Sequence, residues 1–362
     1  MARVLFLDPY HGPSHCALST VLRDRSRHDV ALLTLPPRKW KWRMRGAALA
    51  FEAPARALAR PPQILVATDM LNLPELLGLL RGWLPPSVSV ITYFHENQLT
   101  YPTPSSDERD FHFGLCNVYS ALASDRVVFN SQFHRDEFIA AVPALLRRMP
   151  DHRPEGIAER IRERSDVLGV PLDLEAAPVG PPAARREGLV LWNHRWEEDK
   201  DPEAFFRVME RLDRRGVPFK MMVLGQSFRD HPDCFARAAR DLAHRIERWG
   251  YVPDRADYLR SVARCRVVVS TARQEFFGLA VREAIALGCY PLLPRRLVYP
   301  ELARGRPEHL YDTEEELVER LAALLGGTEP VVSDSLVAEA RALAAPHVVS
   351  AWDQLFDSLA GR

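Results

Sequence analysis

Short apolar runs that alternate with helical segments constrain the fold of this 362-residue sequence more than any other feature. Runs of this length are typical of strands buried on both faces of a parallel sheet, and the intervening helices supply the crossovers. In the first half of the chain, strands are predicted at residues 3–8, 29–35, 63–68, 88–94 and 126–130. In the second half, strands are predicted at 189–192, 219–224, 266–270 and 290–293, with helices at 202–214, at 232–247 and after Gly278.

This alternation predicts two Rossmann-like α/β domains that face one another. A Pro- and Gly-rich stretch after Arg164 interrupts the pattern and indicates a last strand followed by a linker. We therefore expect an N-terminal domain over residues 1–175 and a C-terminal domain over residues 185–345. An Ala-rich helix from about Ser335 and a shorter helix containing Trp352 end the chain, and residues 346–362 are expected to pack back toward the N-terminal domain. Ligands of such sheets bind at the carboxyl ends of the strands, so the ligand is expected in the cleft between the domains.

The composition excludes several classes of protein. The 48 basic and 48 acidic residues balance, so a polyanion has to be held by a local patch and not by net charge. Five scattered cysteines without a C-x-x-C pair are typical of reduced intracellular thiols, and of neither a disulfide framework nor a zinc site. No apolar stretch reaches the ~18 residues of a membrane span. These features predict a soluble, cytoplasmic protein without a metal centre, a membrane contact or an evident obligate protein partner.

Two glutamates, Glu275 and Glu283, are separated by seven residues after the predicted strand 266–270. Glu275 is expected in the loop, and Glu283 in the helix that begins after Gly278. The free N–H groups and the positive dipole end at the start of this helix suit a diphosphate, and a carboxylate on the helix can bind a diol through both oxygens. These are parts of a nucleotide-sugar. Solvated helix charge is the alternative, but the apolar strand before the pair and the small-residue helix after it favour a nucleotide-sugar site.

Arg195 and Lys200 follow the first predicted strand of the second domain. A planar guanidinium and a compact ammonium can together neutralise a departing diphosphate. The alternative is a charged loop before a helix, in which Asp201 is the N-cap and Pro202 the first helical residue. The two interpretations are compatible, because the cations can face the ligand while Asp201 and Pro202 begin the helix.

Polar residues also follow predicted strands of the first domain. His95 comes directly after the fourth strand together with Glu96, which favours a functional role at the strand's carboxyl end. The first loop contains a single glycine, Gly12, between His11 and His15, which counts against a dinucleotide site of the G-x-G-x-x-G type. Gly12 still allows a ligand to approach the backbone closely. A tight turn with chance histidines is an equally good explanation of this loop.

The segment LPPRKWKWRMRG alternates cations with tryptophans. This mixture suits phosphate contact and base stacking on unpaired RNA. The alternative is the start of an amphipathic helix whose tryptophans fill the core of the first domain. The candidate RNA-binding residues are Arg38, Lys39, Trp40, Lys41, Trp42, Arg43 and Arg45. A second basic stretch at residues 147–153 either extends this patch or is a solvated loop.

The spacing of Glu275 and Glu283, with Arg195 and Lys200 at the start of the second domain, resembles the retaining glycosyltransferases of family 4, which have the GT-B fold. Longer segments are similar to the tRNA-queuosine mannosyltransferases: RKWKWRMR, YFHENQLTYP, DERDFHFG, MPDHRP, NHRWEEDKDPEAFF, VLGQSF and EFFGLAVREA with GCYPLLPRRLVYPE. They cover nearly all of the chain. The resemblance implies GDP-mannose as donor and queuosine in a tRNA anticodon as acceptor. Mannose would pass to a cyclopentenediol hydroxyl with its α configuration retained, and without a metal or other cofactor.

Carried over to this sequence, the resemblance also implies roles for single residues. Arg195 and Lys200 would hold the diphosphate, and Glu283 would bind the ribose hydroxyls. Glu275 would contact the mannose, which His95 would reach from the first domain. The other implied donor-binding residues are Gly12, Tyr251, Phe276, Phe277, Gly278 and Leu279. In the first loop, one glycine stands where many members of family 4 have a pair.

Three other functions fit parts of the pattern. A family 4 transferase that acts on a lipid, a glycan or a small metabolite would have residues 40–45 in its core or facing a membrane. A non-catalytic RNA- or nucleotide-binding protein with the same fold would direct Arg195, Lys200 or Glu283 away from the site. A nucleotide-sugar epimerase would turn over the donor without an acceptor.

Overall fold

The computed structural model describes residues 1–102, 110–177, 188–227, 231–326 and 332–360. The chain forms two compact units, of which the first comprises Met1–Pro171 with Ala345–Arg362 and the second Leu172–Ala344. Residues 178–187 of the predicted linker, and residues 107–109 of the DERDFHFG motif, lie outside the described residues.

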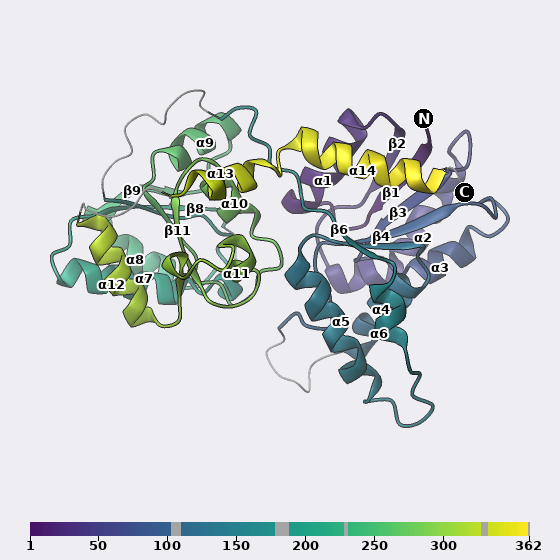
Figure 1. The fold of residues 1–362 in the computed structure, drawn as a ribbon, viewed down its shortest axis with the longest axis horizontal. Coiled ribbons are helices and arrows are strands. Elements are labelled where there is room, and N and C mark those ends of the chain that lie inside the picture. Colours follow the sequence, from purple (N-terminus) through teal and green to yellow (C-terminus); the bar gives the residue numbers. More distant parts are fainter. Residues whose placement is uncertain (103–109, 178–187, 228–230, 327–331, 361–362) are drawn as a thin grey trace. The chain divides into compact units, whose positions relative to one another are not determined.

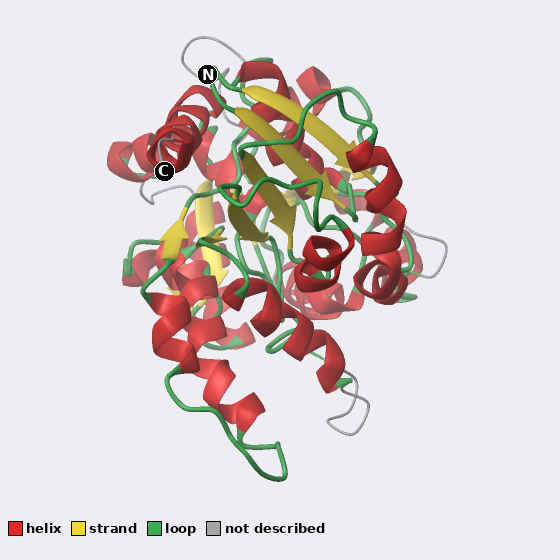
Figure 2. Cartoon of the chain, turned by 90° about the vertical axis from the view of Figure 1, so that its right-hand side faces the viewer, coloured by secondary structure: helices red, strands yellow, loops and turns green. Residues whose placement is uncertain are grey.

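The first unit is built on a parallel sheet of six described strands in the order β2-β1-β3-β4-β5-β6. The strands are β1 (Arg3–Asp8), β2 (Asp29–Thr34), β3 (Ile64–Thr68), β4 (Ser89–Phe94), β5 (Arg126–Phe129) and β6 (Ser165–Val167). The helices are α1 (Pro13–Arg25), α2 (Trp40–Arg56), α3 (Leu73–Leu79), α4 (Phe111–Leu122), α5 (Gln132–Leu146), α6 (Ile157–Arg162) and α14 (Ala345–Ala360). Strands β3 and β4 are buried along their whole length, as expected for a sheet covered by helices on both faces (Figure 2).

Two neighbouring residues of β4 show which helices cover which face of this sheet. The Tyr93 ring packs on Trp352 of α14, with 5.5 Å between ring centroids, whereas Phe94 packs on Phe138 of α5 at 5.0 Å. Successive side chains of a strand point to opposite faces, so α14 and α5 lie on opposite sides of the sheet. The C-terminal helix α14 lies beside α1 (Figure 1), so the two ends of the chain complete the same layer.

The second unit has a parallel sheet of six described strands in the order β12-β11-β10-β7-β8-β9. The strands are β7 (Leu189–Trp192), β8 (Lys220–Leu224), β9 (Ile246–Gly250), β10 (Val267–Val269), β11 (Tyr290–Pro294) and β12 (Leu310–Tyr311). The helices are α7 (Pro202–Arg214), α8 (Cys234–Asp241), α9 (Arg255–Ala263), α10 (Leu279–Ala286), α11 (Tyr299–Leu302), α12 (Glu314–Leu325) and α13 (Asp334–Arg341).

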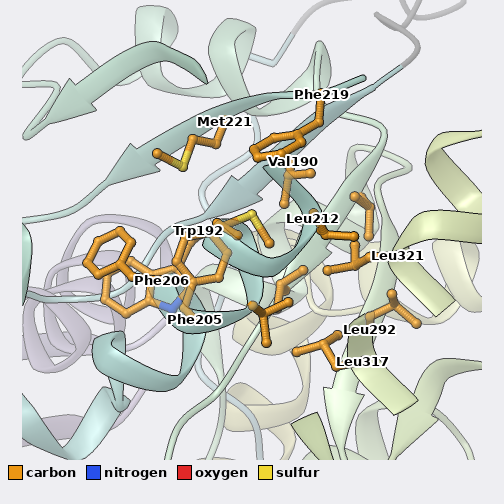
Figure 3. Packing of buried hydrophobic residues seen from close by; sticks show 14 of the residues in the cluster. Val190, Trp192, Phe205, Phe206, Leu212, Phe219, Met221, Leu292, Leu317 and Leu321 are labelled. Carbon is orange, nitrogen blue, oxygen red and sulfur yellow. The ribbon is translucent and has the colours of Figure 1, made fainter. Parts of the chain in front are cut away.

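The core of the second unit lies between this sheet and the helices α7, α8 and α12. Trp192 of β7 packs against Phe205 of α7, and Leu212 of α7 belongs to the same cluster as Leu317 and Leu321 of α12 (Figure 3). Helix α7 buries a continuous apolar face because its core residues recur at three- and four-residue intervals. This packing fixes the start of α7, and with it the segment that precedes the helix.

The predicted class, α/β with two parallel sheets, is confirmed. The strands predicted at 3–8 and 189–192 and the helix predicted at 202–214 have the predicted ends. The side chain of Asp201 accepts a hydrogen bond from the N–H of Ala204, and Pro202 begins the helix, as predicted.

Two predicted elements differ from the structure. The helix predicted at 232–247 ends at Asp241, and the chain then forms the edge strand β9. Trp249 of β9 packs on Trp196 and Phe206, so burial of a large aromatic ring favours the strand where local pattern favoured a helix. The last helix, expected to be shorter than the one before it, has 16 residues against 8 for α13. Its apolar stripe is buried on the first sheet over that full length.

Candidate active site

The strand order of each sheet contains one switch point. In the first sheet the chain passes from β1 to its neighbour β2 and then to β3 on the other side of β1. In the second sheet it passes from β7 through β8 and β9 and then to β10 on the other side of β7. Ligands of open α/β sheets bind at the carboxyl ends of the strands at such points. A ligand is therefore expected at the loops after β1, β3, β7 and β10.

In the second unit, Lys200 lies buried against the loop that follows β10. Its Nζ donates to the carbonyl oxygen of Gln274 (2.7 Å) and to Glu275 Oε2 (3.4 Å), and lies 3.1 Å from Asp199 Oδ2. Burial alone would lower the pKa of Lys200, but the two carboxylates outweigh this effect and raise the pKa above its ordinary value. Lys200 is therefore a fixed positive charge.

Glu275 is held at the start of α10. Its Oε1 accepts hydrogen bonds from the backbone N–H groups of Gly278 (3.0 Å) and Phe277 (3.4 Å). Burial would raise the pKa of Glu275, but Lys200 and these N–H groups lower it overall. Gly278 has φ +77°, and a Cβ there would lie 3.1 Å from Leu302 Cδ2, so the turn requires a glycine. The result is an ionised carboxylate whose position is set by Lys200 and the helix start.

The N–H groups at the start of α10, which the sequence predicts to suit a diphosphate, already have a partner inside the protein. Those of Phe277 and Gly278 donate to Glu275. The side chains of Phe276 and Phe277 are buried, and Leu279 begins α10. The carboxylate of Glu275 thus takes the place at the helix start that an anionic ligand was expected to occupy.

Glu283 lies four residues along α10 from Leu279 and is also buried. Its Oε1 accepts a hydrogen bond from Arg255 Nη2, and it interacts with the Tyr258 hydroxyl, both from α9. Burial raises the pKa of Glu283, and Arg255 offsets this only in part. Arg255 also donates to the carbonyl oxygen of Asp173 at 2.6 Å. Glu283 thus has protein partners, and a diol would have to bind beside or in place of them.

The carboxyl end of β7 lies near both the Lys200–Glu275 pair and the partners of Glu283. Asn193 Nδ2 donates to the Tyr258 hydroxyl (3.0 Å) and to the carbonyl oxygen of Ala280 (2.9 Å), while its Oδ1 is buried without a hydrogen-bond partner in the described part of the chain. Next to it, burial lowers the pKa of His194 to about 3, and the charge of Lys200 acts in the same direction. Arg195 is 44% exposed and forms an ion pair with Glu197 at 3.0 Å. Asn193 therefore contacts the two helices that hold Glu283 and its partners, and His194 lies near the charges of Lys200 and Glu275.

The first unit contains a second polar cluster, centred on Asp8 at the end of β1. Asp8 is fully buried and accepts hydrogen bonds from His11 Nδ1 (2.8 Å) and His15 Nδ1 (2.9 Å). Burial would raise the pKa of Asp8, but its bonds to these histidines lower it overall. Burial would lower the pKa of His15, but Asp8 raises it overall. Gly12 lies between the two histidines and is the N-cap of α1.

His95 completes this cluster from the end of β4. The His95 ring stacks on His15 with 3.8 Å between centroids, and the backbone N–H of His95 donates to Asp69 Oδ1 at 2.8 Å. Burial lowers the pKa of His95 well below its ordinary value, with a further contribution from the charge of His15. Burial raises the pKa of Asp69 to about 7. Three buried atoms of this cluster have no hydrogen-bond partner among the described residues. They are both ring nitrogens of His95 and Oδ2 of Asp69.

The run of cations and tryptophans lies at the start of α2, and its members differ in exposure. Trp40 packs on Phe113 of α4 with 5.1 Å between ring centroids, whereas the Trp42 side chain is 68% exposed. Arg38, Lys39 and Lys41 are exposed, and Arg43 donates to the carbonyl oxygen of Pro36. Arg45 forms an ion pair with Asp110 at 2.8 Å. The core interpretation thus holds for Trp40 and the surface interpretation for Trp42.

Several residues of these clusters were not predicted from the sequence. They are Asp8, Asp69, Asn193, Asp199, Arg255 and Tyr258. Asp8 and Asp69 carry a signal that was available, because each is an acidic residue at the carboxyl end of an apolar strand. Arg255 and Tyr258 carry none, since their helix lies between β9 and β10 and only its packing brings it to Glu283. Tyr251, one of the implied donor-binding residues, is 63% exposed just after β9.

Two further properties bear on the kind of site. No group of three His, Cys, Asp or Glu side chains among the described residues is arranged to hold a metal ion. No helix in the described part of the chain combines the length and the apolar character that crossing a bilayer requires.

Comparison with known proteins identifies the fold and the family. Residues 3–172 match the family described as tRNA-queuosine alpha-mannosyltransferase N-terminal, and residues 188–326 match the family described as glycosyl transferases group 1. Among solved structures, the chain resembles sucrose-phosphate synthase from Thermosynechococcus elongatus, with a TM-score of 0.73, 15% identity and 99% of each chain covered. It also resembles HepE from Anabaena in complex with UDP and glucose, with a TM-score of 0.71, 15% identity, and 99% and 100% of the chains covered.

The fold and these matches define a glycosyltransferase with the GT-B fold. The chain is also 35% identical over 330 residues to the tRNA-queuosine alpha-mannosyltransferase of Drosophila melanogaster. The aligned residues cover 88% of this chain and 85% of that protein. The chain therefore belongs to the tRNA-queuosine alpha-mannosyltransferase family.

Proposed function

We propose that this protein transfers mannose from GDP-mannose to a cyclopentenediol hydroxyl of queuosine in a tRNA anticodon, with the α configuration retained. The observation that carries the proposal is the Lys200–Glu275 pair at the start of α10, at the switch point of the second sheet. The relative from Drosophila supports tRNA as the acceptor substrate, and a tRNA substrate in turn supports a cytoplasmic location.

The leaving diphosphate is the group that Lys200 would stabilise. An ammonium has three N–H donors, and three oxygen atoms already surround Nζ: Gln274 O, Asp199 Oδ2 and Glu275 Oε2. The contact with Glu275 is the longest, at 3.4 Å, so it is the one that a phosphate oxygen would displace. Arg195 is half-exposed and would bind the same diphosphate with its planar fork. Two cations then oppose the charge that develops on the leaving group.

Once released from Lys200, Glu275 remains held through Oε1 by the N–H groups of Phe277 and Gly278. Its Oε2 is then available to a mannose hydroxyl. A carboxylate with this many donors is stabilised as an anion and is a weak nucleophile, so we favour a role in binding over covalent attack. The departing phosphate would take the proton of the acceptor hydroxyl on the same face of the sugar. His95 would contact the mannose, and Glu283 the ribose.

We further propose that the reaction needs no metal, because Lys200 and Arg195 supply the positive charge that a divalent ion supplies in other phosphate sites. Turnover that is unchanged by a chelator would agree with this proposal. Turnover that is lost with the chelator and restored by Mg²⁺ would reject it.

The decisive experiment incubates the purified chain with queuosine-bearing tRNA and a panel of GDP- and UDP-sugars, and then analyses the nucleosides by mass spectrometry. We expect a hexose to be added to queuosine with GDP-mannose. The same assay is applied to Lys200→Met, which removes the ammonium that would stabilise the leaving diphosphate. Lys220→Met is its matched control, because Lys220 is exposed and donates to the carbonyl oxygen of His244. Absence of hexose on queuosine with every donor would reject the function. Conversion of the donor without tRNA would instead indicate an epimerase.

A further inference from the structure

Two segments of the first unit that are far apart in the sequence contact the first residues of α4. They are the start of α2 and the end of α5 with the turn after it. Arg45 of α2 forms an ion pair with Asp110, which caps α4, and its guanidinium lies 5.0 Å from the ring centroid of Phe113. Arg148, just beyond α5, lies over the ring of Phe111 at 4.0 Å. Asp110 and Phe111 are consecutive, so one turn of backbone joins the two basic segments.

The two segments have the same electrostatic character. Residues 38–45 contain five cations and no acidic residue, and residues 147–153 contain three arginines and one aspartate. Arg147, Arg148 and Arg153 are exposed, as are Arg38, Lys39 and Lys41. The whole chain has no net charge, so this is a local concentration of positive charge and not a reflection of composition.

The aromatic residues fit the same partner. Trp42 projects from the α2 segment with 68% of its surface exposed, between the exposed Lys41 and the half-buried Arg43. Phe111 is half-buried beneath Arg148 and fixes the direction of that guanidinium. Cations that contact a polyanion, combined with an aromatic ring free to stack on an unpaired base, are the features of a surface that binds single-stranded or looped RNA.

We propose that the end of α5 and the turn after it, with Arg147, Arg148 and Arg153, form one tRNA-binding surface together with the start of α2, joined through Asp110 and Phe111. This inference rests on the proposed function, because the tRNA acceptor names the partner. The arginines of the second segment contact the phosphodiester backbone, and Trp42 stacks on an unpaired base. Arg45 holds the start of α2 against the start of α4 and does not contact the RNA, because its charge is already paired with Asp110.

The test measures binding of queuosine-bearing tRNA to the full chain by fluorescence anisotropy over a series of salt concentrations. In one variant Arg147, Arg148 and Arg153 are all replaced by Ala. We expect its dependence of log affinity on log salt to be shallower by about one unit for each arginine that contacts a phosphate. A matched control replaces Arg23, Arg60 and Arg81, three exposed arginines of the same unit that lie in segments leading into the amino ends of β2, β3 and β4. The control should retain the slope of the unaltered protein.

A second variant, with Lys in place of the same three arginines, separates the effect of lost charge on binding from an effect of the substitutions on folding. It should recover most of the salt slope, because a lysine also attracts phosphate, and thermal unfolding of all variants checks that the unit is intact. An alanine variant that binds with the unaltered slope would overturn the inference. If the unaltered protein adds mannose to queuosine in that case, the proposed function stands without this surface. If the unaltered protein adds no sugar, the proposed function fails, and the binding data alone decide the surface.

Discussion

Replacement of Lys200 by Met tests the central claim about the site, that this ammonium stabilises the leaving diphosphate. Met retains the length of the side chain and removes its charge. By analogy with the loss of one donor from an oxyanion hole, we expect the barrier to rise by about 2.7–4 kcal/mol, which lowers turnover by roughly two to three orders of magnitude. The assay is single-turnover transfer to queuosine-bearing tRNA at saturating GDP-mannose.

The same substitution also affects folding, because Lys200 has buried ionic partners. Lys200 is the partner of Asp199 and Glu275, both largely buried, so its loss leaves two carboxylates without their cation. Breaking a buried ion pair by removal of one partner costs about 3–5 kcal/mol. Urea unfolding of Lys200→Met should therefore show a marked loss of stability, which has to be separated from the loss of turnover.

The double variant Asp199→Asn with Lys200→Met makes this separation. It removes one of the two stranded charges, so part of the stability should return, whereas turnover should remain at the level of Lys200→Met. Lys220→Met should change neither quantity. A folded Lys200→Met protein whose turnover is within about threefold of the unaltered protein would refute the reasoning, because a barrier change of this size is well below that of a lost donor.

Three other substitutions test the remaining parts of the site. Arg255→Ala removes the cation beside Glu283, and we expect the KM for GDP-mannose to rise about tenfold to a hundredfold, the value of one charged hydrogen bond. Arg260→Ala, which changes an exposed arginine of the same helix, should leave the KM unchanged, and equal KM values for both variants would show that donor binding does not need Arg255 beside Glu283. Gly278→Ala should lower the free energy of unfolding by about 1–2 kcal/mol because φ is +77°, and unaltered urea unfolding would show that the turn relaxes freely. Burial raises the pKa of Asp69 to about 7, so the contribution of Asp69 to stability is largest below pH ~4 and is lost as the pH rises toward 7. Asp69→Asn should therefore reduce the change of the unfolding free energy with pH over that interval. Parallel pH profiles for the variant and the unaltered protein would indicate that Asp69 has an ordinary pKa.

Much of the local structure could be read from the sequence because its signals are local. The strand at 3–8 and the helix at 202–214 follow from a short apolar run and from an N-cap followed by proline. Strand β9 could not be read in this way. Its residues continue a helical pattern, and the strand is favoured by pairing with β8 and by the packing of Trp249 on Trp196 and Phe206, which are contacts with other parts of the chain.

For the candidate site too, the sequence predicted the local placement of residues but not the contacts between them. The sequence placed Arg195, Lys200, Glu275 and Glu283 on loops and a helix of one domain, and they lie around the ends of β7 and β10. It did not indicate which charges pair. Glu275 takes the N–H groups at the start of α10, and Arg255 reaches Glu283 from another helix, because both contacts depend on how α9 and α10 pack.

By itself, the sequence determined that this chain builds two parallel α/β sheets, and it determined which polar residues follow their strands. These properties depend on hydrophobic periodicity and chain order, which are local. Only the tertiary structure decided that β1 lies beside β3 and β7 beside β10, and so which of those polar residues meet. Strand order is set by the packing of helices on both faces of a sheet, through contacts between residues far apart in the chain. That packing brings Asp8 to the histidines and Lys200 to Glu275, where burial changes their pKa values.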